Sequence, residues 1–155
     1  MNNVRVAALV VGMDADQVFD RVSDFASYRD YTPAVQDIKV DRTDGSTCSS
    51  TWWVHFREGV IRWSEVDTID RERLRIDFEQ TEGDFAHFSG SWEVRSVEEG
   101  TELLFDSVFD LGMPSLAAIL DPVAVNALTE SIREIVTGLM GGAVTFRPSP
   151  AGVAG

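Results

Sequence analysis

The sequence has very little from which to build a disulfide or a metal site. Cys48 is its single cysteine and cannot pair within the chain, and there are only two histidines, His55 and His87. Both histidines fall on predicted outer strand faces, away from any cavity. No glycine-rich phosphate loop or nucleotide fingerprint is present. We therefore expect no metal and no cofactor.

Basic residues are also scarce. Thirteen Lys and Arg face 26 Asp and Glu, which gives a formal net charge of -13. A phosphate backbone or an anionic lipid surface would repel such a chain, so we expect neither nucleic acid nor membrane as a partner. Contact with an acidic carrier protein would need a local basic patch, for which the candidates are Arg57, Arg62, Arg71, Arg73 and Arg75.

Long hydrophobic runs are missing too. The N-terminal apolar run is about seven residues long, too short to span a bilayer, and has no basic segment or cleavage site of a secretory signal. The composition, 44% hydrophobic and 25% charged, is typical of a globular domain. We expect a cytoplasmic protein with one domain over residues 1–143 and a flexible tail over 144–155.

The patterns that are present predict strands first and a long helix last. Val4–Val11 is a β-branched strand, and Asp14 with Gln17 forms a capping box that opens the first of two short helices. From residue 35 to residue 111, apolar residues alternate with period two between turns, which predicts about six antiparallel strands. A helical pattern follows Pro114, where Pro122 should kink or divide the helix, with Asp121 as a cap.

A short motif supports this arrangement. Residues 88–94 read Phe-Ser-Gly-Ser-Trp-Glu-Val, and Gly100-Thr101 and Phe105 to Phe109 follow. This stretch resembles the Bet v 1-like or START-like superfamily and, within it, the bacterial polyketide cyclase/dehydratase group. The resemblance implies an α+β helix-grip fold: a curved seven-stranded antiparallel sheet around a long C-terminal helix, with two short helices after the first strand.

Strand alternation predicts which side chains face the helix. A two-residue turn at Glu58-Gly59 would pair Trp52 with Glu65 and Val54 with Trp63. The face that carries these four residues and Asp67 is the more apolar one, so we expect it to be the inner face. The alternative, with Arg62 and Ser64 facing inward, stays open.

Glu65 and Asp67 would then project into an apolar chamber. Burial and mutual repulsion favour the protonated form of one of them, as a general acid or base near neutral pH requires. They are the candidate catalytic residues; the alternative is that both lie near an open rim, solvated or paired with arginines. Candidate substrate contacts, each of which has ordinary core packing or a satisfied polar group as its alternative, are Tyr28, Tyr31, Trp52, Trp63, Phe78, Gln80, Phe88, Trp92, Phe105, Ser107 and Asn126.

The resemblance implies an enzyme that cyclises or dehydrates a hydrophobic ketide-type intermediate, either free or bound to a carrier protein. The chain departs from that group where an arginine is expected, since Val66 or Asp67 stands there, and Ser107 replaces a polar amide. The family mechanism therefore does not carry over unchanged. The alternative is a non-catalytic carrier or sequestering protein. Trp53 on the outer face leaves a homodimer open as well.

Overall fold

Eight strands form one antiparallel sheet in the order β2-β3-β4-β5-β6-β7-β1-β8. The structure is a computed structural model that describes residues 2–42, 45–56, 59–112, 117–141 and 143–147. In chain order the elements are β1 Asn2–Val10, α1 Ala15–Ser23, the 3-10 turn η1 Phe25–Ser27, α2 Tyr28–Tyr31, β2 Val35–Arg42, β3 Thr47–Phe56, β4 Gly59–Asp70, β5 Arg75–Gly83, β6 His87–Val97, β7 Gly100–Asp110, α3 Ala117–Leu139 and β8 Val144–Arg147.

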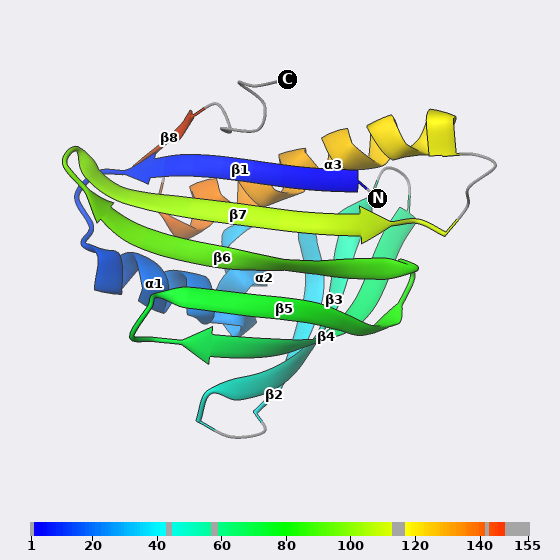
Figure 1. Ribbon diagram of the computed structural model, residues 1–155, viewed down its shortest axis with the longest axis horizontal. Coiled ribbons are helices and arrows are strands. Elements are labelled where there is room, and N and C mark those ends of the chain that lie inside the picture. The colour runs from blue at the N-terminus through cyan, green and yellow to red at the C-terminus, as the bar shows by residue number, and fades with distance from the viewer. Residues whose placement is uncertain (1, 43–44, 57–58, 113–116, 142, 148–155) are drawn as a thin grey trace.

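The sheet curves around the helices, as Figure 1 shows, with α3 running behind β1 and α1 and α2 behind the lower strands. One hydrophobic core fills the space between the concave face and the helices. The expected helix-grip arrangement is confirmed. The sheet has eight strands rather than the expected seven, because the chain adds β8 to the free edge of β1.

The first helix begins where the capping box predicts. The Asp14 carboxylate accepts a hydrogen bond from the Gln17 backbone N–H at 2.9 Å, and the Gln17 side chain accepts one from the Asp14 N–H at 3.0 Å. Val18, Phe19 and Val22 form its buried face. These contacts fix α1, which leads the chain to the short α2 and its buried Tyr28.

The long helix is not divided at Pro122: Asp121 and Pro122 both lie inside α3, so Asp121 does not cap it. Proline removes a single N–H donor, and near the start of a helix this loses only one backbone bond. The expected start at Pro114 lies outside the described residues. The face that α3 turns to the sheet is apolar and buried: Ala124, Leu128, Ile132, Ile135, Val136 and Leu139.

The tail prediction is wrong for residues 144–147. Val144–Arg147 alternates as a strand should and pairs antiparallel with β1. Arg147 anchors this strand by ion pairs of 2.6 Å to Glu99 and 3.4 Å to Glu102. The missing periodicity and the Pro, Gly and Ala content of this segment suggest a mobile terminus by pattern alone. The partners of Arg147 lie in the β6–β7 turn and on β7, far away in the sequence. Residues 148–155 are outside the described part of the chain.

The β3–β4 hairpin is shifted by two residues from the predicted register. Phe56 pairs with Gly59, so Trp52 lies opposite Trp63 and Ser50 lies opposite Glu65. Because the shift is an even number of residues, it leaves every side chain on its predicted face. The expected inner face is therefore correct, although the expected cross-strand pairs are wrong.

Candidate functional site

A cavity of about 40 Å³ lies between the concave face of the sheet and α3. Strands β3 to β7 supply one wall, and η1, α2 and α3 supply the other. The lining is almost entirely apolar and aromatic. It consists of Phe25, Tyr28, Trp52, Val54, Trp63, Glu65, Phe78, Phe88, Trp92, Phe105, Leu128, Ser131, Ile132 and Ile135.

Glu65 is the one lining side chain, among the residues that the structure describes, that carries a carboxyl group. It lies on β4 with only 5% of its surface exposed, and Trp63 Nε1 donates a hydrogen bond to its Oε1 at 2.7 Å. Its cross-strand partner on β5 is Gln80, next to an irregularity in the ladder between Ser64 and Glu65. Such bulges change the direction in which side chains point. This one lies next to Glu65, whose carboxyl group lines the cavity.

Asp67 lies two residues further along β4 and has 0% of its surface exposed. Ser50 Oγ donates to Asp67 Oδ2 at 2.7 Å, and Cys48 Sγ donates to the same oxygen at 3.7 Å. Trp52 Nε1 in turn donates to Ser50 Oγ at 2.9 Å. Asp67 therefore lies behind the cavity wall, held by a chain of hydrogen bonds rather than by a cation.

The Asp67 carboxyl group favours the protonated form of Glu65. Burial, followed by the hydrogen bond and the repulsion from Asp67, raises the pKa of Glu65 well above its ordinary value of 4.5. The Trp63 indole lowers this pKa and is outweighed. Asp67 Oδ1 is a buried acceptor with no fixed donor, and a protonated Glu65 supplies one. Glu65 therefore keeps its proton to a higher pH than an exposed glutamate does.

Burial also raises the pKa of the Tyr28 hydroxyl, helped by electrostatic repulsion from the Glu65–Asp67 pair and from Asp24. This hydroxyl donates a short hydrogen bond to the Val22 carbonyl. Tyr28 therefore lines the cavity with its ring, and its polar atom is committed to the backbone.

The aromatic wall is packed edge to face around two parallel indoles. The rings of Trp52 and Trp63 stack with centroids 6.0 Å apart and planes 6° from parallel. Phe78 lies over Gly90, where an added Cβ would approach its ring to 2.8 Å and the Asp106 carbonyl oxygen to 2.3 Å. The glycine of the sequence motif therefore leaves room for an aromatic ring beside the cavity.

The predicted site residues separate into three groups. The cavity brings together Tyr28, Trp52, Trp63, Glu65, Phe78, Phe88, Trp92 and Phe105. Asp67 and Ser107 are buried beside the lining rather than in it, and Gln80 Nε2 donates to the Phe85 carbonyl at 2.9 Å. Tyr31, with 46% of its surface exposed, and Asn126, also exposed, lie outside it.

Pattern reasoning missed two polar residues. Ser50 donates a hydrogen bond to Asp67. Strand alternation with Trp52 places Ser50 on the inner face, but the predicted hairpin register did not bring it close to the acids. Ser131 is a lining residue on α3 whose Oγ donates to the Ala127 carbonyl at 3.0 Å. A serine inside an apolar helical stripe is the signal that could have identified it.

Arginine does not neutralise the acid pair. Within the part of the chain that the structure describes, no ion pair involves Glu65 or Asp67. Arg62 lies on the outer face and pairs with Glu82 at 3.1 Å. The alternative inner face is therefore excluded, and so is the solvated-rim interpretation of the acids. Val66 points outward with 38% of its surface exposed.

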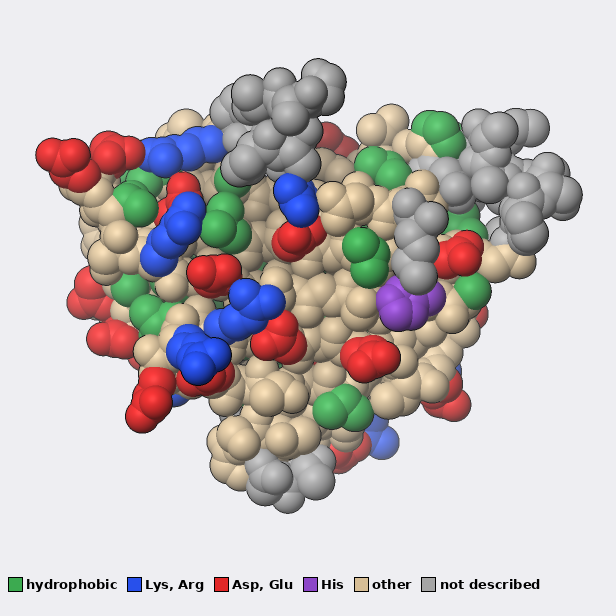
Figure 2. Space-filling view, in the orientation of Figure 1, with side chains coloured by type: hydrophobic (Ala, Val, Ile, Leu, Met, Phe, Trp, Pro, Cys, Tyr) green, Lys and Arg blue, Asp and Glu red, His purple; other side chains and the backbone are tan. Residues whose placement is uncertain are grey.

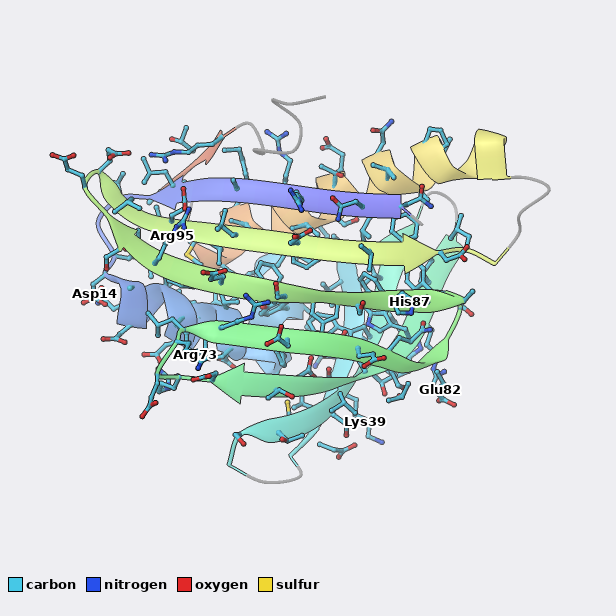
Figure 3. All side chains as sticks on the ribbon, in the orientation of Figure 1. Asp14, Lys39, Arg73, Glu82, His87 and Arg95 are labelled. Atoms are coloured by element: carbon cyan, nitrogen blue, oxygen red, sulfur yellow. The ribbon has the colours of Figure 1, made fainter. Side chains whose placement is uncertain are left out.

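The candidate basic patch is not formed by its described members. Arg71 pairs with Asp20, Arg73 with Asp70, and Arg75 with both Asp77 and Glu93. Figure 2 shows charges of both signs interspersed on this face of the sheet, and Figure 3 places Arg73 and Arg95 at separate positions. Arg57 lies outside the described residues.

In the part of the chain that the structure describes, no group of three or more His, Cys, Asp or Glu side chains is arranged to hold a metal ion. His87 bonds Ser89 at 3.0 Å near one end of β6, where Figure 3 labels it. No described helix is long and apolar enough to cross a membrane.

Comparison with known families gives one match over most of the chain. The model of a family described as "Polyketide cyclase / dehydrase and lipid transport" matches residues 11–135. A curated relative, the actinorhodin polyketide synthase bifunctional cyclase/dehydratase of Streptomyces coelicolor, is 33% identical over 75 residues. That alignment covers 44% of this chain and 24% of the relative, so the chain matches about a quarter of that protein.

Solved structures show the same fold at low identity. A protein from Thermus thermophilus, TTHA0849, is 23% identical with a TM-score of 0.83, covering 92% of this chain and 97% of that one. The Zhui aromatase/cyclase from Streptomyces sp. R1128 is 17% identical with a TM-score of 0.75, covering 92% and 94%. A ginseng major latex-like protein from Panax ginseng is 15% identical with a TM-score of 0.65, covering 87% and 96%.

Proposed function

Because this chain belongs to the polyketide cyclase/dehydrase and lipid transport family, we propose that it binds a hydrophobic ketide-type molecule in its inner cavity and promotes its cyclisation or dehydration. The observation that supports this most is the buried carboxyl pair, without a cation, at the wall of an aromatic cavity. Plain core packing gives no reason to bury two acids without a cation, because an unpaired buried charge is costly.

In this proposal Glu65 is the acid that meets the substrate, because it lines the cavity and Asp67 does not. Asp67 is a positioning residue: its charge keeps the proton on Glu65, and Ser50 keeps Asp67 in place. Proton transfer from a positioned side chain contributes about 10²- to 10⁴-fold to rate, most effectively when its pKa lies near the working pH.

A dehydration balances on this pair alone. Glu65 gives its proton to the β-hydroxyl oxygen as the C–O bond breaks and water leaves. The α C–H bond of the substrate supplies a proton to the carboxyl pair, and its electrons form the new C=C bond. The pair starts and ends with one proton, so the reaction needs no external acid or base.

The size of the cavity sets a condition on this proposal. A pocket for a drug-sized ligand is about 300–1,000 Å³, whereas the present cavity is about 40 Å³. A ketide-type ligand therefore binds only if the wall moves outward. The α3 side of the cavity is formed by Leu128, Ile132 and Ile135, which make no polar contact with the sheet through their side chains.

The test uses 4-hydroxy-4-phenylbutan-2-one, whose dehydration product is a conjugated enone seen by ultraviolet absorbance. Wild type should accelerate enone formation, and Glu65→Gln should reduce the rate by about 10²-fold or more while still binding the compound. Binding is followed by tryptophan fluorescence. The exposed-acid control Glu79→Gln should keep both rate and binding.

Two results would contradict the proposal. If wild type and both variants bind the compound and none accelerates the reaction, the protein acts as a carrier for hydrophobic molecules. If Glu65→Gln matches the wild-type rate, the acceleration has a source other than the carboxyl pair.

A further inference from the structure

The polar groups around the cavity are unevenly divided between hydrogen-bond donors and acceptors. Four lining donors are already committed: Trp52 donates to Ser50, Trp63 to Glu65, Tyr28 to the Val22 carbonyl and Ser131 to the Ala127 carbonyl. Among the lining side chains, the Trp92 indole N–H has no hydrogen-bond acceptor within the described residues. A ligand carbonyl therefore finds few donors here.

Acceptors, in contrast, are left over beside Glu65. Asp67 Oδ1 and Gln80 Oε1 are both buried without a fixed donor. Asp67 follows Glu65 on the same face of β4, and Gln80 is its cross-strand partner on β5. One proton on Glu65 can satisfy only one of these two oxygens. Unsatisfied buried acceptors of this kind are rare in folded proteins and call for a donor.

The walls around these acceptors suit a positive charge. The stacked indoles of Trp52 and Trp63, with Tyr28 and Phe88, present aromatic faces and edges, and aromatic faces attract ammonium groups. No arginine, lysine or histidine appears in the described lining. The formal net charge of -13 also draws cations towards the protein and repels anions.

We propose that this cavity selects a ligand with an aromatic or ketide-type body and a protonated amine, and that the ammonium group donates to Glu65, the lining carboxyl group beside the free oxygens of Asp67 and Gln80. This inference rests on the proposed function only in requiring that a ligand enters the same cavity. It narrows the hydrophobic ligand of that proposal to a cationic one.

A pH dependence follows from the groups that face Glu65. These are Asp67 on the same strand, Cys48 behind it on β3 and Tyr28 from α2; the described lining of α3 contributes Ser131 and apolar side chains. A bound ammonium group stabilises the ionised form of Glu65. Amine binding should therefore release about one proton at a pH where Glu65 of the free protein is protonated.

The experiment compares three probes on one skeleton by isothermal titration calorimetry at pH 7: 2-phenylethylamine, 2-phenylethanol and 3-phenylpropanoate. The amine should bind about tenfold or more tightly than the alcohol, because charge-assisted hydrogen bonds are about twice as strong as neutral ones. The carboxylate should bind most weakly. Repeating the titration in phosphate and Tris buffers counts the released protons.

Variants localise the preference. Glu65→Gln should reduce the amine-to-alcohol ratio towards one and abolish proton release, whereas the exposed control Glu79→Gln should keep both. Equal binding of amine and alcohol by wild type, or a preference that survives Glu65→Gln, would overturn the inference and leave the proposed function standing. Binding of none of the three probes would overturn both, because no ligand then enters the cavity.

Discussion

Replacing Glu65 by glutamine should change how the stability of this protein depends on pH. The amide is close in shape to a protonated carboxyl group: its oxygen can still accept from Trp63 Nε1, and its NH₂ can donate to the free Oδ1 of Asp67. The variant therefore keeps the contacts of the protonated site and loses only its ability to ionise. We expect it to fold normally.

The sign and size of the effect follow from the raised pKa of Glu65. Between the ordinary value of 4.5 and the folded value, the native state holds one proton more than the unfolded state, so the free energy of unfolding falls as pH rises. The slope approaches about 1.4 kcal/mol per pH unit over this interval. Relative to the glutamine variant, wild type should therefore lose stability from about pH 5 upward until the folded pKa is passed.

Urea unfolding followed by far-UV circular dichroism, from pH 4 to pH 8, measures this difference directly. Taking wild type minus variant at each pH cancels the groups that both proteins share. Glu79→Gln, on the outer face of β5, is the matched control and should follow wild type. If the difference in the free energy of unfolding stays constant over this range, or grows in favour of wild type as pH rises, the pKa of Glu65 is not raised.

Two further predictions concern the walls of the site. Gly90→Ala should destabilise the fold by about 1–3 kcal/mol, because the new Cβ would meet the Asp106 carbonyl, whereas Gly45→Ala, with open space around it, should change little; thermal unfolding compares them. Ser50→Ala should cost about 1–3 kcal/mol by removing the close donor to Asp67 Oδ2, and a cost below about 0.5 kcal/mol in urea unfolding would show that Asp67 does not depend on this bond.

The sequence predicts the sheet and its inner face well for a physical reason. Strand alternation has a period of two, so the apolar set of β6 and β7 can face only one side, and an even register shift leaves faces unchanged. This is why Glu65 and Asp67 are correctly placed inward although the hairpin pairs are wrong. The capping box of α1 is predictable because its two partners lie three residues apart.

The remainder of the site depends on distances that patterns do not contain. Ser50 reaches Asp67 only through the actual register of β3 and β4, and Arg147 stabilises β8 through acids far away in the chain. Asn126 lies on the exposed side of α3 because one residue of helical phase turns a side chain by about 100°. The cavity volume depends on how the aromatic rings pack, which sequence alone does not fix.

The proposed chemistry depends above all on a Glu65 carboxyl group that keeps its proton to a pH well above 4.5. The most direct measurement is a ¹³C NMR titration of protein labelled at the glutamate side-chain carboxyl, with the Glu65 signal assigned by its loss in Glu65→Gln. The account predicts that this signal stays in the protonated position at a pH well above 4.5, where exposed glutamates have ionised. A Glu65 signal that titrates at or below 4.5 would contradict it.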